Sequence, residues 1–349
     1  MENNMKKLLI VCLSIILCIG SLTGCQRQTK LVFTTGLSGN QLFKIGSETC
    51  TMPEIMIYLT TFYNQYADIY GEEMWNYDFG GVSLENHVKD VVLSKMAQIK
   101  IMNLMAEERE IELTKEEEEK VRAAAKNYFE QLETELIEKE KITKDVAEQV
   151  FREYTLANKV YSAITESAAM EISDDEARAV TVQVIYLKNW KLKDNEKTPL
   201  NESEKLKVLK KAKEALVKVN AGESFELLAA EYGDDKQILK SYARGDVSAQ
   251  FEEILFSMDE GDVSNVIEYE DGYYIVKCIS TMDFEATQKN KLVLMEQRKR
   301  KAFSDAYSEI ATTTHSQFRD KQWEKLQMRE EIHSTDANFF EIYDEFVKQ

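Results

Sequence analysis

The stretch AGESFELLAAEYGDD, residues 221–235, sets the interpretation of the second half of the chain. Ser224 is a good helix N-cap, and the apolar residues after it predict a short helix that ends near Gly233. A lysine-rich amphipathic pattern predicts another helix just before it, over residues 201–219. Gly222 then follows as a typical helix stop. Two consecutive helices separated by a glycine turn therefore lie at the centre of this region.

Strand-like patterns flank these two helices. Apolar and other residues alternate at residues 180–187, VTVQVIYL, which predicts a strand soon after the capping sequence SDDE at residues 173–176. Further on, residues 251–256, FEEILF, predict a third helix, and residues 271–278, DGYYIVKC, predict a closing strand. Together these strands and helices predict a compact α/β unit over residues 173–285.

The regions on both sides of this unit have helical patterns. Residues 45–172 contain an apolar stripe at helical spacing and a capping box from Thr114 to Glu117. Residues 286–349 are charged, and their apolar residues are spaced to bury one helix face. The sequence therefore predicts helices before and after the α/β unit.

The N-terminus has the features of an export signal. Lys6 and Lys7 precede an apolar run that is too short to span a bilayer, and the segment ends in LTGC at residues 22–25. This ending resembles the lipobox of bacterial lipoproteins, which implies cleavage before Cys25 and lipidation of its thiol. We expect a lipoprotein signal peptide over residues 1–24 and a flexible polar tether over residues 25–44. An ordinary secretion signal with a free cysteine is the alternative.

The net charge of −18 limits the partners of the chain. Nucleic acid is disfavoured because phosphate binding depends on clustered lysine and arginine. An anionic membrane surface repels an acidic chain, so the acyl anchor is expected to be the only membrane contact. Cys50 and Cys278 are expected to be small, partly buried apolar residues, and a disulfide between them is left open. His87, His315 and His333 are scattered, so neither a metal site nor a cofactor is indicated.

Residues 213–277 resemble the parvulin family of peptidyl-prolyl isomerases. The matching segments are AGESFELLAAEYGDD at residues 221–235, FEEILFSMDEGDVS at residues 251–264 and GYYIVK at residues 272–277. An extended, ordered match of this kind is more specific than a single short motif. The resemblance implies peptidyl-prolyl isomerisation as the activity.

The flanking regions resemble the helical chaperone lobe of PrsA and SurA foldases. The matching residues are IG at 45–46, YGE at 70–72 and AEEREIELT at 106–114. In that family the C-terminal helices pack on the N-terminal lobe. The resemblance implies an α+β fold with an all-helical lobe formed by residues 45–172 and 286–349. It also implies that the inserted parvulin-like domain has an antiparallel-rich, four-stranded sheet with helices. With the lipobox, the resemblance is to PrsA-type foldase lipoproteins of Gram-positive bacteria.

The resemblance also implies a site for a proline-containing peptide. The residues assigned to substrate binding are apolar, as a slot for the proline ring requires, and they are Leu239, Val247 and Phe251, with Phe256 and Met258 as supports. The implied catalytic residues are Asp235, beside the rotating amide, and Tyr274, a supporting hydrogen-bond donor. No nucleophile is needed, because binding the twisted amide more tightly than the planar forms lowers the barrier. Core packing, or a surface turn for Asp235, is the alternative.

The sequence departs from the parvulin pattern in two places. The family usually has two histidines linked across the sheet, and their positions fall on Val184 and Tyr274, with no histidine within residues 173–285. The loop QILKS at residues 237–241 is also shorter than usual. Three functions stay open: an isomerase, a non-catalytic holdase that binds unfolded chains, and a cell-envelope scaffold.

The expected partners follow from the resemblance and from the lipobox. They are unfolded or partly folded exported polypeptides, a second copy of the chain in a homodimer, and the membrane, through a lipid on Cys25. The expected location is the extracytoplasmic face of the cell membrane.

Overall fold

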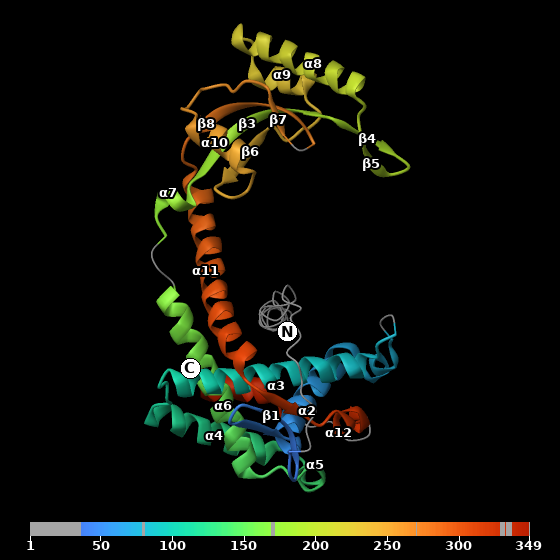
Figure 1. Ribbon diagram of the computed structural model, residues 1–349, viewed down its shortest axis with the longest axis vertical. Helices are drawn as coiled ribbons and strands as arrows, with labels where there is room; N and C mark the ends of the chain where they lie inside the picture. Colours follow the sequence, from blue (N-terminus) through green and yellow to red (C-terminus); the bar gives the residue numbers. More distant parts are fainter. Residues whose placement is uncertain are drawn as a thin grey trace. The chain divides into compact units, whose positions relative to one another are not determined.

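The computed structural model describes residues 36–78, 81–168, 172–269, 271–328, 332 and 337–348. Two compact units divide the chain (Figure 1): residues 1–164 with 303–349, here the terminal unit, and residues 165–302, here the central unit. The predicted signal peptide, Cys25 and His333 lie outside the described residues.

Helices dominate the terminal unit. The Thr114 hydroxyl accepts a hydrogen bond from the Glu117 N–H, and the Glu117 carboxylate accepts one from the Thr114 N–H, which confirms the predicted capping box. Two of the helices, α6 and α11, include residues of both units. The helices are α2 (Met52–Tyr70), η2 (Glu72–Asn76), α3 (Leu84–Glu108), α4 (Lys115–Gln131), α5 (Thr134–Glu140), α6 (Lys144–Ala168), α11 (Phe284–Thr313), α12 (Asp320–Lys325) and α14 (Phe339–Phe346).

A three-stranded antiparallel sheet also belongs to the terminal unit. Its strands are β1 (Gln41–Ile45), β2 (Glu48–Thr51) and β9 (Ser316–Phe318), in the order β2-β1-β9. The sequence patterns do not predict this sheet, and the last residues of the predicted tether form part of β1. Because β9 pairs with β1, residues near the C-terminus lie beside residues near the start of the described chain.

A buried ionic cluster joins α2, α3 and α6. The Lys100 ammonium donates to the Glu54 carboxylate at 2.8 Å and to both oxygens of the Glu153 carboxylate at 2.6 Å. Lys100 is fully buried, and burial raises the pKa of Glu54. Loss of the shared ammonium would leave two buried carboxylates without a counter-charge, which typically costs about 3–5 kcal/mol. The cluster is therefore a structural feature of this unit.

The central unit contains a four-stranded antiparallel sheet with the order β6-β3-β8-β7. β3 (Ala179–Lys188) pairs with β8 (Gly272–Ser280) and with the edge strand β6 (Leu239–Ala243), and β7 (Ile267–Tyr269) forms the other edge. The other elements are α7 (Asp174–Ala177), β4 (Trp190–Lys193), β5 (Glu196–Pro199), α8 (Glu202–Asn220), α9 (Phe225–Tyr232) and α10 (Ala249–Ser257). The predicted α+β class, with a four-stranded antiparallel sheet in the inserted domain, is confirmed.

The predicted order of elements in this unit is wrong in two places. A β4–β5 hairpin follows β3, and the segment 237–241 that was assigned to a loop includes the start of β6. The residues of β6, LKSYA, lack a strong apolar pattern because β6 is an edge strand whose side chains are half-buried or exposed. Pairing with β3, rather than its own sequence, defines this strand.

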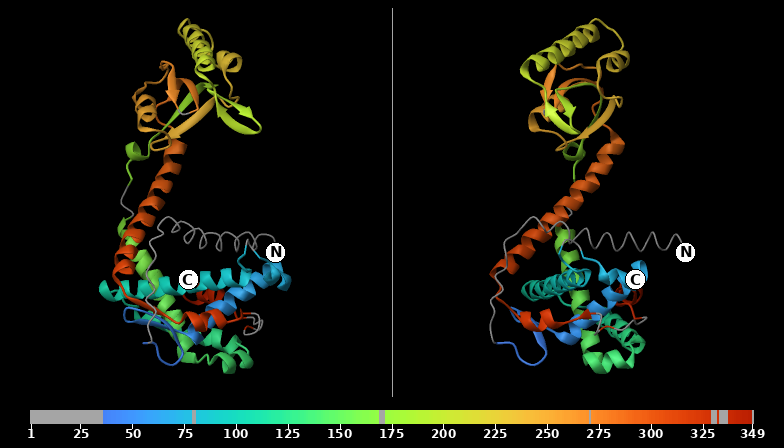
Figure 2. Two further views of the ribbon diagram at one scale, coloured as in Figure 1. Left: turned by 45° about the vertical axis from the view of Figure 1, so that its right-hand side comes forward. Right: turned by 90° about the vertical axis from the view of Figure 1, so that its right-hand side faces the viewer.

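Different helices cover the two faces of the sheet (Figures 1 and 2). Successive side chains of a strand point to opposite faces, and β3 follows this rule. Ile185 and Leu187 pack with residues of α8 and α9, whereas Val182 and Val184 pack with residues of α10. We call these two surfaces the α8/α9 face and the α10 face.

Two further expectations concern membranes and cysteines. Among the described residues, no helix is both long enough and apolar enough to cross a membrane. Cys50 and Cys278 are both buried and both carry free thiols, so the disulfide that the sequence left open is not formed. Burial raises the pKa of both thiols, as expected for residues that pack as small apolar groups.

Candidate active site

An aromatic cluster occupies the α10 face. Phe251 of α10 is 2% exposed, and its ring centroid lies 4.7 Å from that of Tyr269, 5.4 Å from that of Tyr274 and 6.2 Å from that of Tyr242. The Tyr186 ring lies 4.9 Å from the Tyr274 ring. The four tyrosines are half-buried, so their rings form an accessible apolar surface that the buried Phe251 supports.

The strand register explains how these rings come together. Tyr186 and Tyr274 are directly paired in β3 and β8, so their side chains point to the same face. Tyr242 pairs with Val180, whose side chain belongs to the α10 face. Phe251 lies on the buried side of α10.

A hydrogen-bond network holds the hydroxyl ends of two of these tyrosines. Tyr274 Oη donates to Asp271 Oδ1 at 3.0 Å, and Tyr186 Oη donates to Asp271 Oδ2 at 2.9 Å. Trp190, the first residue of β4, donates from its indole N–H to Tyr186 Oη at 3.1 Å. One carboxylate therefore fixes two phenol groups at the edge of the aromatic surface.

The environment raises the pKa of both phenols above the ordinary value for tyrosine. Burial is the largest cause of the raised pKa of Tyr274, and the hydrogen bond to the Asp271 carboxylate raises this pKa further. Burial and the same carboxylate also raise the pKa of Tyr186, while the hydrogen bond from Trp190 acts in the opposite direction. Both groups are therefore hydrogen-bond donors across the physiological range.

Gly272 allows the close packing beside this network. A Cβ atom at Gly272 would lie 2.3 Å from Tyr186 Cε2 and 2.6 Å from the carbonyl oxygen of Leu187. Both distances are far below ordinary contact, so a larger residue cannot occupy the position without a shift of the tyrosine ring. The glycine next to Asp271 therefore has a steric role in the site.

Asp235 lies in the turn before β6. Its carboxylate accepts hydrogen bonds from Lys240 Nζ at 2.8 Å and from the Gln237 N–H at 3.0 Å, and these bonds lower its pKa. Lys240 pairs with Val182 of β3, so its side chain starts on the α10 face. The ion pair thus adds a charged group beside the aromatic surface.

Comparison with known proteins shows which domain family the residues of this site match. The PPIC-type PPIASE domain family matches residues 167–282, which include every side chain of the aromatic cluster. The foldase protein PrsA of Caldanaerobacter subterraneus is 24% identical over 326 residues, covering 90% of this chain and 96% of that protein. Residues 167–282 therefore match a PPIC-type parvulin domain, and most of the chain is similar to a PrsA foldase.

Other PrsA proteins match shorter segments. Foldase protein PrsA 3 of Bacillus anthracis is 37% identical over 93 residues, which cover 25% of this chain and 33% of that protein. The crystal structure of peptidylprolyl isomerase (PrsA) from Bacillus cereus is 16% identical, covers 78% of this chain and 97% of that chain, and has a TM-score of 0.33.

Most of the apolar residues predicted for the parvulin slot lie together on the α10 face. Phe251 and Met258 are buried there, and Val247 and Phe256 pack against them. Phe256 lies between the guanidinium groups of Arg178 and Arg244, whose Cζ atoms are 5.1 and 4.5 Å from its ring centroid. This position agrees with a supporting role for Phe256 rather than with direct contact to a ligand.

Leu239 does not join the other slot residues. It pairs with Gln183 of β3, whose side chain donates to Glu226 of α9, so Leu239 points to the α8/α9 face. Its side chain is 52% exposed. The resemblance placed Leu239 in a loop, whereas strand pairing in β6 directs it away from the slot. Lys240 and Tyr242 take the α10 face instead.

The sequence did not identify two residues of this site. Tyr186 and Asp271 complete the network around Tyr274, whereas Val184 pairs with Val276 and does not oppose Tyr274. Strict alternation along residues 180–187 puts Tyr186 on the same face as Val184, so this alternation could have identified Tyr186 as a residue of the site. No local signal identified Asp271, which acts through the tertiary structure.

Proposed function

We propose that this PrsA-type chain is a foldase that catalyses peptidyl-prolyl isomerisation at the α10 face of its central unit. The observation that carries the proposal is the accessible tyrosine surface with two phenol donors fixed by Asp271. A proline ring would contact the half-buried tyrosine rings, supported from below by Phe251. The phenols of Tyr186 and Tyr274 each donate their single O–H to Asp271, so their role would be to hold the two rings in place beside the rotating amide.

The chemistry needs only preferential binding of the twisted peptide bond. Uncatalysed rotation about a peptidyl-proline bond takes tens to hundreds of seconds, which can limit folding. Each tenfold acceleration requires about 1.4 kcal/mol of extra binding to the transition state. The aromatic surface excludes water from the rotating bond, and Asp235 with Lys240 lies at its side.

The substrates in this proposal are unfolded or partly folded exported polypeptides. Anchoring outside the cell membrane is supported by the lipobox at residues 22–25. Replacement of Cys25 by Ala should allow a high-salt wash to release the protein from the membrane fraction, whereas the wild type should stay bound. Retention of Cys25→Ala protein after the high-salt wash would contradict the lipid anchor and leave the isomerase proposal untouched.

A non-catalytic holdase is the second candidate. Two observations favour it: no histidine lies within residues 173–285, and Phe251 is only 2% exposed, which limits its direct contact with a ligand. In that case the tyrosine surface would bind apolar segments without accelerating rotation.

The decisive experiment is a refolding assay limited by one proline isomerisation, with the chain from Gln26 to Gln349. The wild-type protein should accelerate refolding, and the Tyr186→Phe/Tyr274→Phe variant should lose most of the acceleration. Tyr273→Phe is the matched control, because Tyr273 is buried on the α8/α9 face. No acceleration by the wild type, together with suppressed aggregation of an unfolded protein, would establish the holdase instead.

A further inference from the structure

The charge of the chain is segregated. Between Lys188 and Asn220 there are ten lysines and five acidic residues, whereas the whole chain has a net charge of −18. This segment contains the β4–β5 hairpin and α8, and eight of its lysines are exposed. The hairpin and the start of α8 adjoin, because Lys191 Nζ lies 2.7 Å from Glu204 Oε1. We call the outer surface of these elements the basic face.

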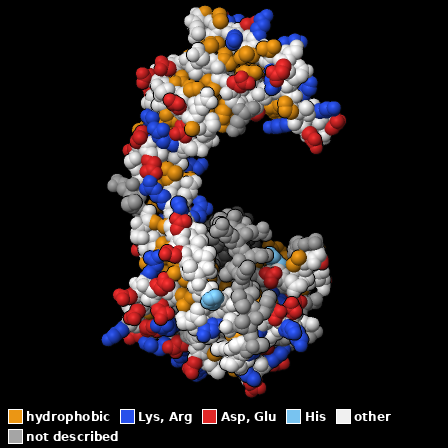
Figure 3. Space-filling view, in the orientation of Figure 1, with side chains coloured by type: hydrophobic (Ala, Val, Ile, Leu, Met, Phe, Trp, Pro, Cys, Tyr) orange, Lys and Arg blue, Asp and Glu red, His pale blue; other side chains and the backbone are white. Residues whose placement is uncertain are grey.

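Apolar side chains are interleaved with the lysines on this face. Leu206, Lys210, Lys213 and Val217 follow one another at helical spacing along α8, and Leu206 and Val217 are 65% and 68% exposed. Figure 3 shows basic and apolar side chains, with acidic ones among them, over the part of the central unit that carries α8 and α9. The stripe lies opposite Ala212 and Ala215, which pack on the sheet.

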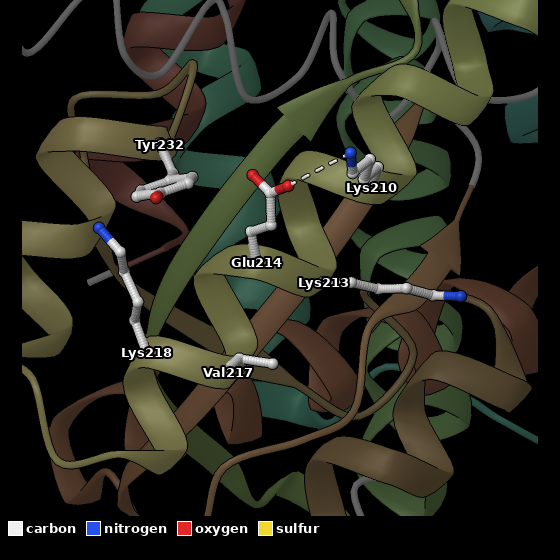
Figure 4. A pocket seen from close by; sticks show the side chains of 6 residues that line it. All are labelled: Lys210, Lys213, Glu214, Val217, Lys218 and Tyr232. Atoms are coloured by element: carbon white, nitrogen blue, oxygen red, sulfur yellow. Dashed lines mark ion pairs between the residues drawn. The ribbon is translucent and has the colours of Figure 1, made fainter.

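A shallow hollow of about 450 Å³ lies on this stripe. Lys210, Lys213 and Lys218 surround it together with Glu214, Val217 and Tyr232 (Figure 4). The Glu214 carboxylate is 3.9 Å from Lys210 Nζ, and Lys218 Nζ lies 5.0 Å from the Tyr232 ring centroid. The hollow combines ammonium groups with an apolar and aromatic floor, which suits a partner that is both anionic and amphipathic.

We propose that the basic face docks on an anionic lipid bilayer. Lipid phosphates match the lysines, and the acyl boundary just beneath them accommodates Leu206 and Val217, so a bilayer satisfies both kinds of side chain at once. An acidic polypeptide would satisfy the lysines alone. The Debye length is about 8 Å at physiological ionic strength, so the local positive charge outweighs distant acidic residues at contact. The net acidity of the chain predicts that the acyl anchor is the only membrane contact. In this proposal the basic face is a second contact.

Vesicle sedimentation tests the docking without the anchor. The chain from Gln26 to Gln349 should sediment with vesicles of equal parts phosphatidylglycerol and phosphatidylcholine at low salt. It should not sediment with pure phosphatidylcholine vesicles, and high salt should release it from the anionic ones. Absence of sedimentation with the anionic vesicles, or equal sedimentation with both, overturns the proposal.

Charge reversal locates the contact. Lys210→Glu/Lys213→Glu should weaken sedimentation by at least about tenfold. The matched control is Lys115→Glu/Lys126→Glu in α4, which changes the net charge equally at exposed lysines of the terminal unit and should have little effect. Leu206→Ser/Val217→Ser should weaken binding without changing its salt dependence. Equal loss in both lysine pairs, or capture on immobilised polyglutamate but not on anionic vesicles, overturns the assignment to a bilayer. Because the assay contains neither Cys25 nor a proline substrate, its outcome is independent of the proposed foldase activity.

Discussion

The two faces of the central sheet are made by the same strands but differ in chemistry. On the α8/α9 face, Ile185 and Ile275 pack with Phe225 and Leu228 in an apolar core. On the α10 face, half-buried tyrosines surround Phe251, and two of their hydroxyls meet at one carboxylate. The difference shows how one sheet can stabilise the domain through one face and hold a candidate site on the other. Because successive side chains along a strand point to opposite faces, one strand sequence can supply apolar residues to one face and tyrosines to the other.

The largest effects are expected from removal of one ring on each face. Phe251→Ala and Phe225→Ala each delete a buried ring and should each lower the free energy of unfolding by about 3–5 kcal/mol. Only Phe251→Ala should also reduce isomerase activity per folded molecule, because it removes the support of the tyrosine surface. Urea unfolding and proline-limited refolding assays measure the two quantities. Equal activity of the two variants would show that the faces do not differ in function.

The Asp271 carboxylate is expected to have the next largest effect. Asp271→Asn weakens two hydrogen bonds to a charged acceptor and should cost about 1.5–3 kcal/mol. The pKa of Tyr274 should fall but stay raised, since burial is its largest cause. Asp234→Asn is the matched control, because this exposed carboxylate accepts a hydrogen bond from the Lys188 N–H outside the network.

The sign of the pH dependence follows from these raised pKa values. In the unfolded chain the tyrosines ionise near pH 10, below their folded pKa values. The free energy of unfolding therefore does not depend on these two groups below that pH. It falls as the pH rises above it, since only the unfolded chain releases these protons. Tyrosinate absorbance should show delayed ionisation of Tyr186 and Tyr274 in the wild type, and an unchanged titration in Asp271→Asn would contradict the network.

Gly272→Ala should have a smaller effect on stability but a clear effect on the site. The added Cβ meets the Tyr186 ring at 2.3 Å, so the ring must move, and overpacking of this kind costs about 1–3 kcal/mol. Activity should fall because Tyr186 shifts away from Asp271. Gly261→Ala serves as a control for general glycine effects, since nothing lies within 4 Å of a Cβ there, although its positive φ adds some strain. Normal activity in Gly272→Ala would argue against a role for the Tyr186 hydroxyl.

The smallest effect concerns the ion pair between Lys240 and Asp235. Lys240→Ala should lower stability at neutral pH by less than about 1 kcal/mol, because the pair is about one third exposed. The lowered pKa of Asp235 gives stability that is present above its ordinary value of 3.8 and is lost as the pH falls through the folded value. The variant should therefore match the wild type at low pH. Lys236→Ala is the control, and NMR titration of Asp235 should show an upward shift only in Lys240→Ala.

Much of the fold could be predicted because local sequence patterns determine many of its helices and strands. The alternation at residues 180–187, the capping box at Thr114 and the glycine stop after residue 219 each reflect forces within a few residues, and each corresponds to an element of the structure. β6 and the β1–β2–β9 sheet could not be predicted in this way. Short edge strands with mixed composition are stabilised by partners distant in the sequence.

The sequence by itself determined the helical flanks, the central α/β unit, the acidic charge and the apolar character of Phe251 and Met258. The tertiary structure alone decided which side chains meet. Strand register paired Tyr186 with Tyr274 and placed Asp271 between their hydroxyls, and it turned Leu239 to the opposite face. The physical reason is that periodicity fixes the face of a residue only within a known strand, whereas register between strands depends on pairing across long loops. Likewise, only the tertiary structure shows that the lysines share one exposed face, because it places α8 beside the β4–β5 hairpin.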